Sequence, residues 1–200
     1  YSIQQTTDGG YIVAGKTYTF GAVWSDAYVL KLDSDGSLEW QKTFGGSGND
    51  WAYSIQETRD GGYIVAGLTG SFGAVWYDAY VLKLDSDGSL SWQQMFGEDG
   101  YDAAYSIQQT TDGGYIVAGV TGLFGDNYNS DVYILKLNSD GSLAWQKTFG
   151  GTGYDEAYSI QQTTDGGYVV AGWTYSFASS DDHDVYVLKL DSNGDLHPFQ

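Results

Sequence analysis

The sequence predicts an all-β fold: a β-propeller of four antiparallel blades with four strands each, the last blade truncated. Three observations predict it. Tyr-Ser-Ile-Gln begins at Tyr1, Tyr53, Tyr105 and Tyr158, which divides the 200 residues into repeats of about 52 residues. Each repeat holds four strand-like segments separated by turn sequences, and a single proline among many β-branched and aromatic residues leaves no helix-like segment. Four-stranded units at this period must stack to bury both faces, as propeller blades do.

The repeats cover residues 1–52, 53–104, 105–157 and 158–200. We expect one domain, with membership of a longer array as the alternative, because Tyr1 stands in the middle of a motif. A right-handed solenoid of hairpins is the competing architecture. The interpretation of Tyr1 is that the chain was processed or excerpted from something longer.

The first two segments of a repeat, YSIQQT and YIVAG, are separated by Asp-Gly-Gly, as at residues 8–10. Asp-Gly predicts a tight primed hairpin turn, because glycine accepts a positive φ. The third segment, Tyr28 to Leu32, alternates as a half-buried strand does, with Lys31 pointing away from the apolar face. Asp-Ser-Asp-Gly at 33–36 then leads to a fourth segment.

That fourth segment carries a tryptophan in three repeats, at Trp40, Trp92 and Trp145. We expect these rings to pack between blades, each contributing roughly 2 to 3 kcal/mol. In the last repeat the corresponding segment contains Pro198, which cannot donate to a strand ladder, so the last outer strand should be short. Either a ring of four blades closes by packing alone, or the blades belong to a larger assembly.

A hydrophobic run ending in glycine, then a spaced Tyr, then a Trp, resembles the Kelch-type propeller repeat. Here the pattern is Tyr11 to Gly15, Tyr28 and Trp40, and it recurs in the next two repeats. Ala14-Gly15 stands where the Kelch family usually has Gly-Gly. The chain is also similar to PQQ-like repeats of bacterial and archaeal surface proteins. Both resemblances imply a propeller, and neither implies a particular ligand.

The charge of the chain excludes some partners. Against 26 Asp and Glu there are 8 Lys and Arg, so nucleic acid should be repelled. No apolar run is long enough for a membrane helix, and we expect no membrane insertion. The acidic surface favours an extracellular or cell-surface location. The absence of cysteine excludes disulfides, thiolate zinc sites and cysteine nucleophiles.

The loops between the second and third strands differ most between repeats, and they should share one face with the connections between repeats. Exposed aromatic rings there can stack on sugars or anchor a protein. The predicted ligand-binding residues are Trp24, Trp76, Tyr77 and Tyr128, and in the fourth loop Asp182 and His183. The alternatives are simple packing of the rings and a solvated acidic fourth loop.

Acidic residues recur at two other places. Asp33 with Asp35 could offer oxygen ligands to calcium, although side-chain bonds to the turn backbone are the alternative. Asp50, Asp102 and Asp155 precede the YSIQ segment and should fasten the connection through backbone amides. We expect no other cofactor and no dedicated metal site.

Almost every polar side chain is repeated, whereas catalytic sites are usually asymmetric. The sequence therefore predicts a non-catalytic structural, adhesion or self-assembly module acting through protein partners or self-association. A lectin-like module that binds glycans through its aromatic loops is the alternative. A third hypothesis, part of a polysaccharide-degrading enzyme, needs catalytic groups that the repeats do not reveal.

Overall fold

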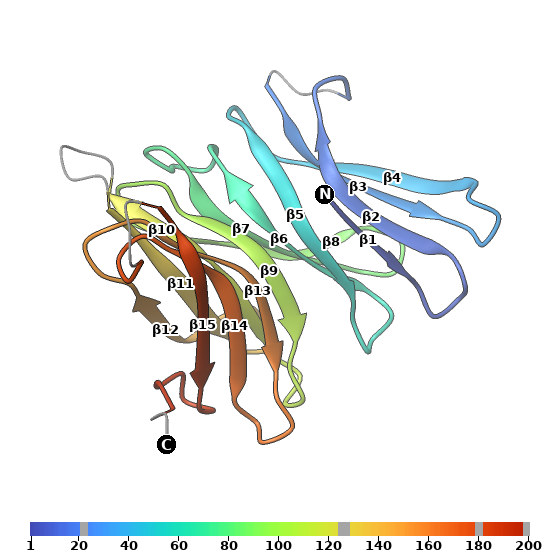
Figure 1. Ribbon diagram of the computed structural model, residues 1–200. Coiled ribbons are helices and arrows are strands. Elements are labelled where there is room, and N and C mark those ends of the chain that lie inside the picture. The colour runs from blue at the N-terminus through green and yellow to red at the C-terminus, as the bar shows by residue number, and fades with distance from the viewer. Residues whose placement is uncertain (21–23, 124–128, 179–181, 198–200) are drawn as a thin grey trace.

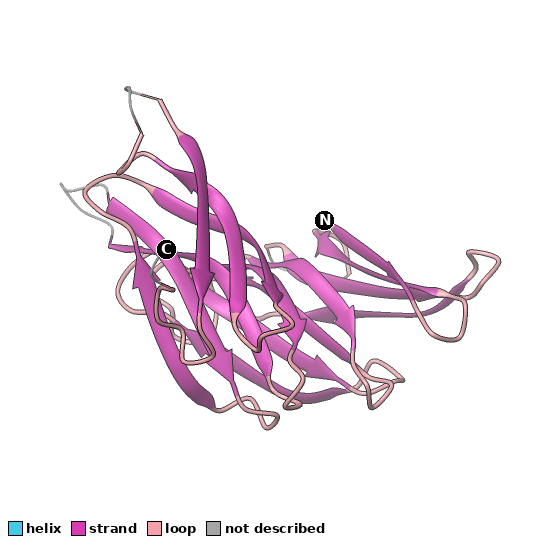
Figure 2. Cartoon of the chain, turned by 60° about the horizontal axis from the view of Figure 1, so that its bottom comes forward, coloured by secondary structure: helices cyan, strands magenta, loops and turns pink. Residues whose placement is uncertain are grey.

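The computed structural model describes residues 1–20, 24–123, 129–178 and 182–197, and this part of the chain is built from strands and loops (Figures 1 and 2). The strands are β1 (Ser2–Gln5), β2 (Tyr11–Thr17), β3 (Asp26–Leu32), β4 (Leu38–Phe44), β5 (Asp50–Glu57), β6 (Tyr63–Thr69), β7 (Asp78–Leu84), β8 (Leu90–Phe96), β9 (Ala103–Gln109), β10 (Tyr115–Leu123), β11 (Asn129–Leu137), β12 (Leu143–Phe149), β13 (Asp155–Gln162), β14 (Tyr168–Thr174) and β15 (Asp184–Leu190). Within these residues no helix is of a length and apolarity that would span a membrane.

The strands form four antiparallel sheets in simple up-and-down order. Sheet 1 is β1–β4, sheet 2 is β5–β8, sheet 3 is β9–β12 and sheet 4 is β13–β15. Sheet 4 has three strands, followed by one bridge between Leu190 and Leu196. The predicted all-β repeat units and the truncation of the last one are confirmed.

Consecutive sheets stack face to face, with the first strand of each sheet contacting the first strand of the next (β1 with β5, β5 with β9, β9 with β13). Figure 1 shows the result as an open fan, with sheet 1 at one end and sheet 4 at the other. A hydrophobic cluster fills each space between sheets, and a further cluster of Leu68, Ala103 and Val120 lies between sheets 2 and 3. Trp40, Trp92 and Trp145 pack on these clusters, each against a tyrosine ring of the following sheet, as the sequence predicts.

The third strand of a central sheet is buried on both faces, so the prediction of a half-buried strand with a solvent-facing lysine was wrong. Lys83 on β7 is only 5% exposed, and its Nζ lies 3.0 Å from Asp60 Oδ2 and 3.1 Å from the Leu84 carbonyl oxygen. The alternation of residues along the third strand suggests that one of its faces meets solvent. In a central sheet, however, a neighbouring sheet covers each face. A buried ammonium in the stack needs the turn aspartate as its partner.

The hairpin loops are also one residue longer than a primed two-residue turn. The amide of Gly61 donates to the Thr58 carbonyl, and the amide of Thr58 donates to the Gly62 carbonyl. Gly61 has a φ of 79°. This is the arrangement of three-residue hairpin loops, in which a left-handed glycine ends the turn.

The two ends of the fan expose faces that the inner sheets bury. Ile3 on β1 is 65% exposed, whereas Ile55, at the same position of sheet 2, is 5% exposed. Val185 and Val187 on β15 are also exposed, although their counterparts in sheets 1 to 3 are buried. Self-association through such faces stays a prediction.

Candidate functional site

The loops between second and third strands and the connections between sheets lie on one face of the fan, as predicted. Each connection is bound to both neighbouring sheets by backbone hydrogen bonds. The amide of Asp102 donates to the Tyr77 carbonyl of sheet 2 (2.8 Å), and the amide of Tyr101 donates to the Gly122 carbonyl of sheet 3 (2.8 Å). The connection segments therefore mark three junctions between sheets.

An aspartate fastens each junction. Asp50 Oδ2 accepts hydrogen bonds from the Gly46 amide (2.9 Å) and the Ser71 hydroxyl (2.9 Å), and Asp50 Oδ1 accepts one from the Thr69 hydroxyl. Asp155 likewise accepts from the Gly151 amide (3.0 Å) and the Ser176 hydroxyl. The predicted fastening by backbone amides is confirmed, and at these two junctions a serine hydroxyl adds a further hydrogen bond.

The junction between sheets 2 and 3 departs from this pattern. The connections read FGGSGND, FGEDGYD and FGGTGYD, so Glu98 replaces the glycine found at 46 and 151. The sequence also has leucine at 123, where the neighbouring repeats have Ser71 and Ser176. Asp102 Oδ2 accepts from the Glu98 amide (3.1 Å), while Asp102 Oδ1 is buried without a hydrogen-bond partner.

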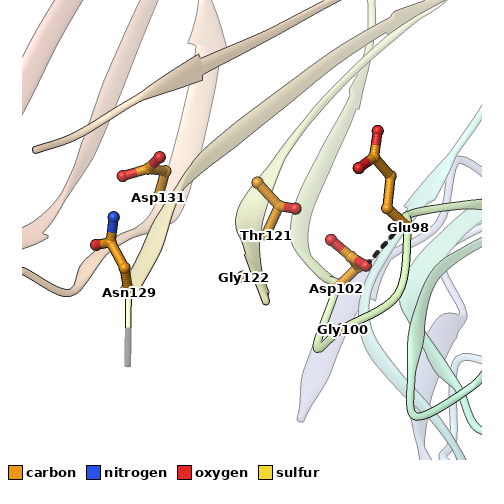
Figure 3. A pocket seen from close by; sticks show the side chains of 7 residues that line it. All are labelled: Glu98, Gly100, Asp102, Thr121, Gly122, Asn129 and Asp131. Carbon is orange, nitrogen blue, oxygen red and sulfur yellow. Dashed lines mark hydrogen bonds between the residues drawn. The ribbon is translucent and has the colours of Figure 1, made fainter. Parts of the chain in front are cut away.

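These changes accompany a pocket of about 320 Å³ at this junction (Figure 3). Its lining residues are Glu98, Gly100, Asp102, Thr121, Gly122, Asn129 and Asp131. Figure 3 shows Glu98 and Asp102 on one side, joined by the hydrogen bond to Asp102, with Asn129 and Asp131 together on the other side. Glu98 is exposed, Asp102 is buried and Asp131 is half-buried, so three carboxyl groups in different environments share one pocket.

The electrostatics of the pocket favour a protonated acid. Burial raises the pKa of Asp102 to about 6. The hydrogen bonds from the Thr121 hydroxyl and the Glu98 amide act in the opposite direction, because they favour the charged form. The charges of Asp78 and Glu98 raise the pKa further. Burial, with the charge of Asp155, also raises the pKa of Asp131. A carboxyl group with a pKa near 6 can donate a proton at mildly acidic pH.

Three of the predicted ligand-binding residues come together in a second hollow beside this pocket. Trp24, Trp76 and Tyr77 line a shallow groove of about 200 Å³ at the junction of sheets 1 and 2. Trp24 is 59% and Trp76 is 54% exposed. Tyr77 connects the groove to the pocket, because its carbonyl accepts the Asp102 amide and its ring lies 5.7 Å from that of Tyr101.

The other predicted site residues are not part of this groove. Tyr128 lies outside the described residues. Asp182 and His183 are exposed and interact with each other, Nδ1 to Oδ1 at 2.9 Å, while the His183 ring packs on Trp173 and Tyr175. In the described part of the chain, no cluster of three or more His, Cys, Asp or Glu could hold a metal ion.

The acidic turns use their carboxylates locally. Asp33 Oδ1 accepts hydrogen bonds from the amides of Asp35 (2.9 Å) and Ser37 (2.8 Å). This is the backbone-bonded alternative to calcium binding that the sequence left open.

A family model and one solved structure support the β-propeller architecture. Residues 110–143 match a domain of unknown function, DUF5122, described as a β-propeller. The fold is similar to that of an endo-1,5-α-L-arabinanase from Thermotoga petrophila, with 15% identity and a TM-score of 0.52, over 98% of this chain and 58% of that one. A protein of unknown function from Bacteroides caccae is similar over 97% of this chain and 78% of that one, at 13% identity and a TM-score of 0.39. No curated protein matches the sequence.

These comparisons support a β-propeller repeat fold and overturn one functional expectation. We expected a non-catalytic structural, adhesion or self-assembly module, and not an enzyme. That prediction was wrong to exclude catalysis, because a protein of similar fold is an endo-1,5-α-L-arabinanase. The physical reason lies in the repeats, whose symmetry breaks at Glu98 and Leu123.

The sequence held a signal for this site that the search for catalytic motifs missed. Aligning the repeats position by position isolates Glu98 and the leucine at 123 as departures within otherwise shared segments. Such paired departures indicate a junction that has lost its standard fastening. The raised pKa of Asp102 could not be predicted in this way, because it depends on burial.

Proposed function

We propose that this chain is a carbohydrate-active β-propeller that hydrolyses glycosidic bonds of a polysaccharide at the pocket of Glu98 and Asp102. The observation that carries the proposal is the pairing of an exposed and a buried carboxyl group at one junction of otherwise repeated design. Glycoside hydrolysis uses two carboxyl groups with different roles, and different environments are what separate their roles.

In this proposal Asp102 is the general acid. Its raised pKa keeps a substantial protonated fraction near pH 6, and its Oδ1 has no internal hydrogen bond to lose when it donates to the leaving oxygen. Glu98, at the exposed edge of the pocket, supplies the second carboxylate, which attacks the anomeric carbon or activates a water molecule.

The groove of Trp24 and Trp76 supplies the sugar platform. Exposed indole rings offer flat apolar faces with a polar N–H, a combination suited to stacking on sugar rings. Because Tyr77 belongs to the groove and accepts the Asp102 amide, a chain of several sugars bound on the rings would run towards the carboxyl pair. Arabinan is the first substrate to test, since the protein of similar fold is named for its action on it.

The test is release of reducing ends from a polysaccharide panel that includes linear arabinan, at pH 5 to 7. Glu98→Gln and Asp102→Asn should each lower the rate by roughly 100-fold or more, as loss of a catalytic carboxyl does. Asp35→Asn, in an exposed turn on the opposite face, is the matched control and should retain full activity. No hydrolysis of any panel member, or equal rates for all variants, would refute the proposal.

We also propose, from the acidic surface and the resemblance of the repeats, an extracellular or cell-surface location and a Kelch-type or PQQ-like ancestry with four blades. Polysaccharide as a partner fits that location.

A further inference from the structure

A half-buried and a fully buried carboxyl group meet at the junction of sheets 3 and 4. Asp131 lies on β11, and Asp155 is the first residue of β13. A Cβ added at Gly150 would lie under 3.0 Å from both Asp131 Oδ1 and Asp155 Oδ2. The two carboxyl groups therefore converge on one point of the backbone, which only a glycine can occupy.

Each of the three side chains around Gly150 and Gly151 has one buried oxygen atom without a hydrogen-bond partner. Asp155 is fully buried, and its Oδ1 accepts no hydrogen bond although its Oδ2 is bound to Ser176 and Gly151. Asp131 Oδ1 is also buried and unpartnered. The Asn129 side chain donates through Nδ2 to the Gly151 carbonyl (3.0 Å), which leaves its buried Oδ1 without a donor.

Such an arrangement needs a positive partner. Burying two carboxylates side by side costs several kcal/mol unless a proton, a basic side chain or a metal ion offsets their charge. No ion pair to a Lys, Arg or His reaches Asp131 or Asp155 among the described residues.

The junction of sheets 1 and 2 provides an internal comparison. There both oxygens of Asp50 are hydrogen-bonded, and Trp24 occupies the position of Asn129. That junction therefore offers one unpartnered oxygen, on Asp26, in place of three. The third unpartnered atom at sheets 3 and 4 comes from an amide, a neutral oxygen that hard cations accept.

We propose that Asn129, Asp131 and Asp155 form a binding site for a hard divalent cation such as Ca²⁺ at the junction of sheets 3 and 4. The ion would take oxygen ligands from the two carboxylates and the amide, and water would complete its coordination. Asn129 and Asp131 also line the pocket of Glu98 and Asp102, but neither of those two carboxyl groups is among the proposed ligands. The function of the cation site would be to lock the last sheet of the fan to sheet 3.

The test is calorimetric titration of chelator-treated protein with CaCl₂ at pH 7.5, together with thermal unfolding in Ca²⁺ and in EDTA. The wild-type protein should bind one Ca²⁺ at this site, and Ca²⁺ at 100 times its Kd should raise Tm by about 5 to 10 °C. Asp155→Asn and Asp131→Asn should lose the binding. Glu98→Gln and Asp191→Asn, the latter in an acidic turn, should keep it.

A second readout separates cation binding from mere damage to the fold. Asp131→Asn removes one of two repelling charges, so in EDTA its Tm should equal or exceed that of the wild type, while its response to Ca²⁺ is lost. Absence of Ca²⁺ binding in the wild type would overturn the proposal and assign a shared proton or water to the pair. Binding that survives both Asp131→Asn and Asp155→Asn would overturn it as well.

Discussion

Replacing Asp102 with asparagine should change how stability depends on pH. Burial raises the pKa of this carboxyl from 3.8 to about 6. Between these values the folded state binds a proton that the unfolded state has released, so the free energy of unfolding falls as the pH rises from about 4 to about 7. The shift corresponds to about 3 kcal/mol, or a decrease in Tm of about 6 to 12 °C for a chain of this length.

Asparagine imitates the neutral acid, since its oxygen can still accept from the Glu98 amide. The variant and the wild type should therefore have similar Tm values at pH 4, and the variant should be the more stable at pH 7.5. Scanning calorimetry from pH 3.5 to 8 measures the difference, with Asp35→Asn as the control that follows the wild type throughout. If Asp102→Asn also runs parallel to the wild type, Asp102 ionises as an exposed aspartate does, and the reasoning fails.

Three further perturbations test the architecture and the groove. Lys83→Met should cost about 1 to 3 kcal/mol in chemical denaturation at pH 7, since it leaves the Leu84 carbonyl and Asp60 without their buried donor. Although burial opposes it, hydrogen bonds from Thr58, Lys83 and the Gly62 amide lower the pKa of Asp60 to about 2, so this cost should be largest above pH 4 and should decrease as the pH falls towards 2. Gly67→Ala should destabilise by more than 3 kcal/mol, because its Cβ would overlap the Trp51 carbonyl oxygen. Replacing Trp24 and Trp76 together by alanine should weaken polysaccharide binding at least tenfold in affinity electrophoresis while changing Tm by under about 3 °C.

Each of these has a matched control. Lys42→Met, at an exposed lysine, should cost less than about 0.5 kcal/mol. Gly61→Ala has open space around its Cβ and should cost only about 1 kcal/mol for its left-handed backbone. Phe177→Ala, at another exposed ring, should leave polysaccharide binding unchanged. Equal effects in a variant and its control would contradict the corresponding interpretation.

The sequence was informative where one residue type has one structural use. Recurring Asp-Gly sequences located the hairpins, and the tryptophans of the fourth strands packed between sheets as expected. Burial by a neighbouring sheet was harder to predict, because alternation along a strand looks the same whether the second face meets water or another sheet. Lys83 shows this, because a solvent-exposed lysine and a buried lysine paired with a turn aspartate give the same sequence pattern.

The site was predictable in part for a similar reason. The aromatic residues of the groove could be found as exposed types in variable loops, and Trp24, Trp76 and Tyr77 do lie together. The carboxyl pair was not predicted because every complete repeat has an aspartate at the position of Asp102, and only the residues around this aspartate differ. What changes its surroundings is an added glutamate four residues before it and a missing serine, replaced by Leu123, 21 residues after it.

The most direct test of the central claim restores the repeat pattern at this junction. The double variant Glu98→Gly with Leu123→Ser would give the junction of sheets 2 and 3 the residues of its neighbours. The account predicts that polysaccharide hydrolysis disappears while Tm stays equal or rises, because Asp102 regains a serine donor and loses its carboxylate partner. Hydrolysis at the wild-type rate in this variant would contradict the claim that the departure from symmetry forms the active site.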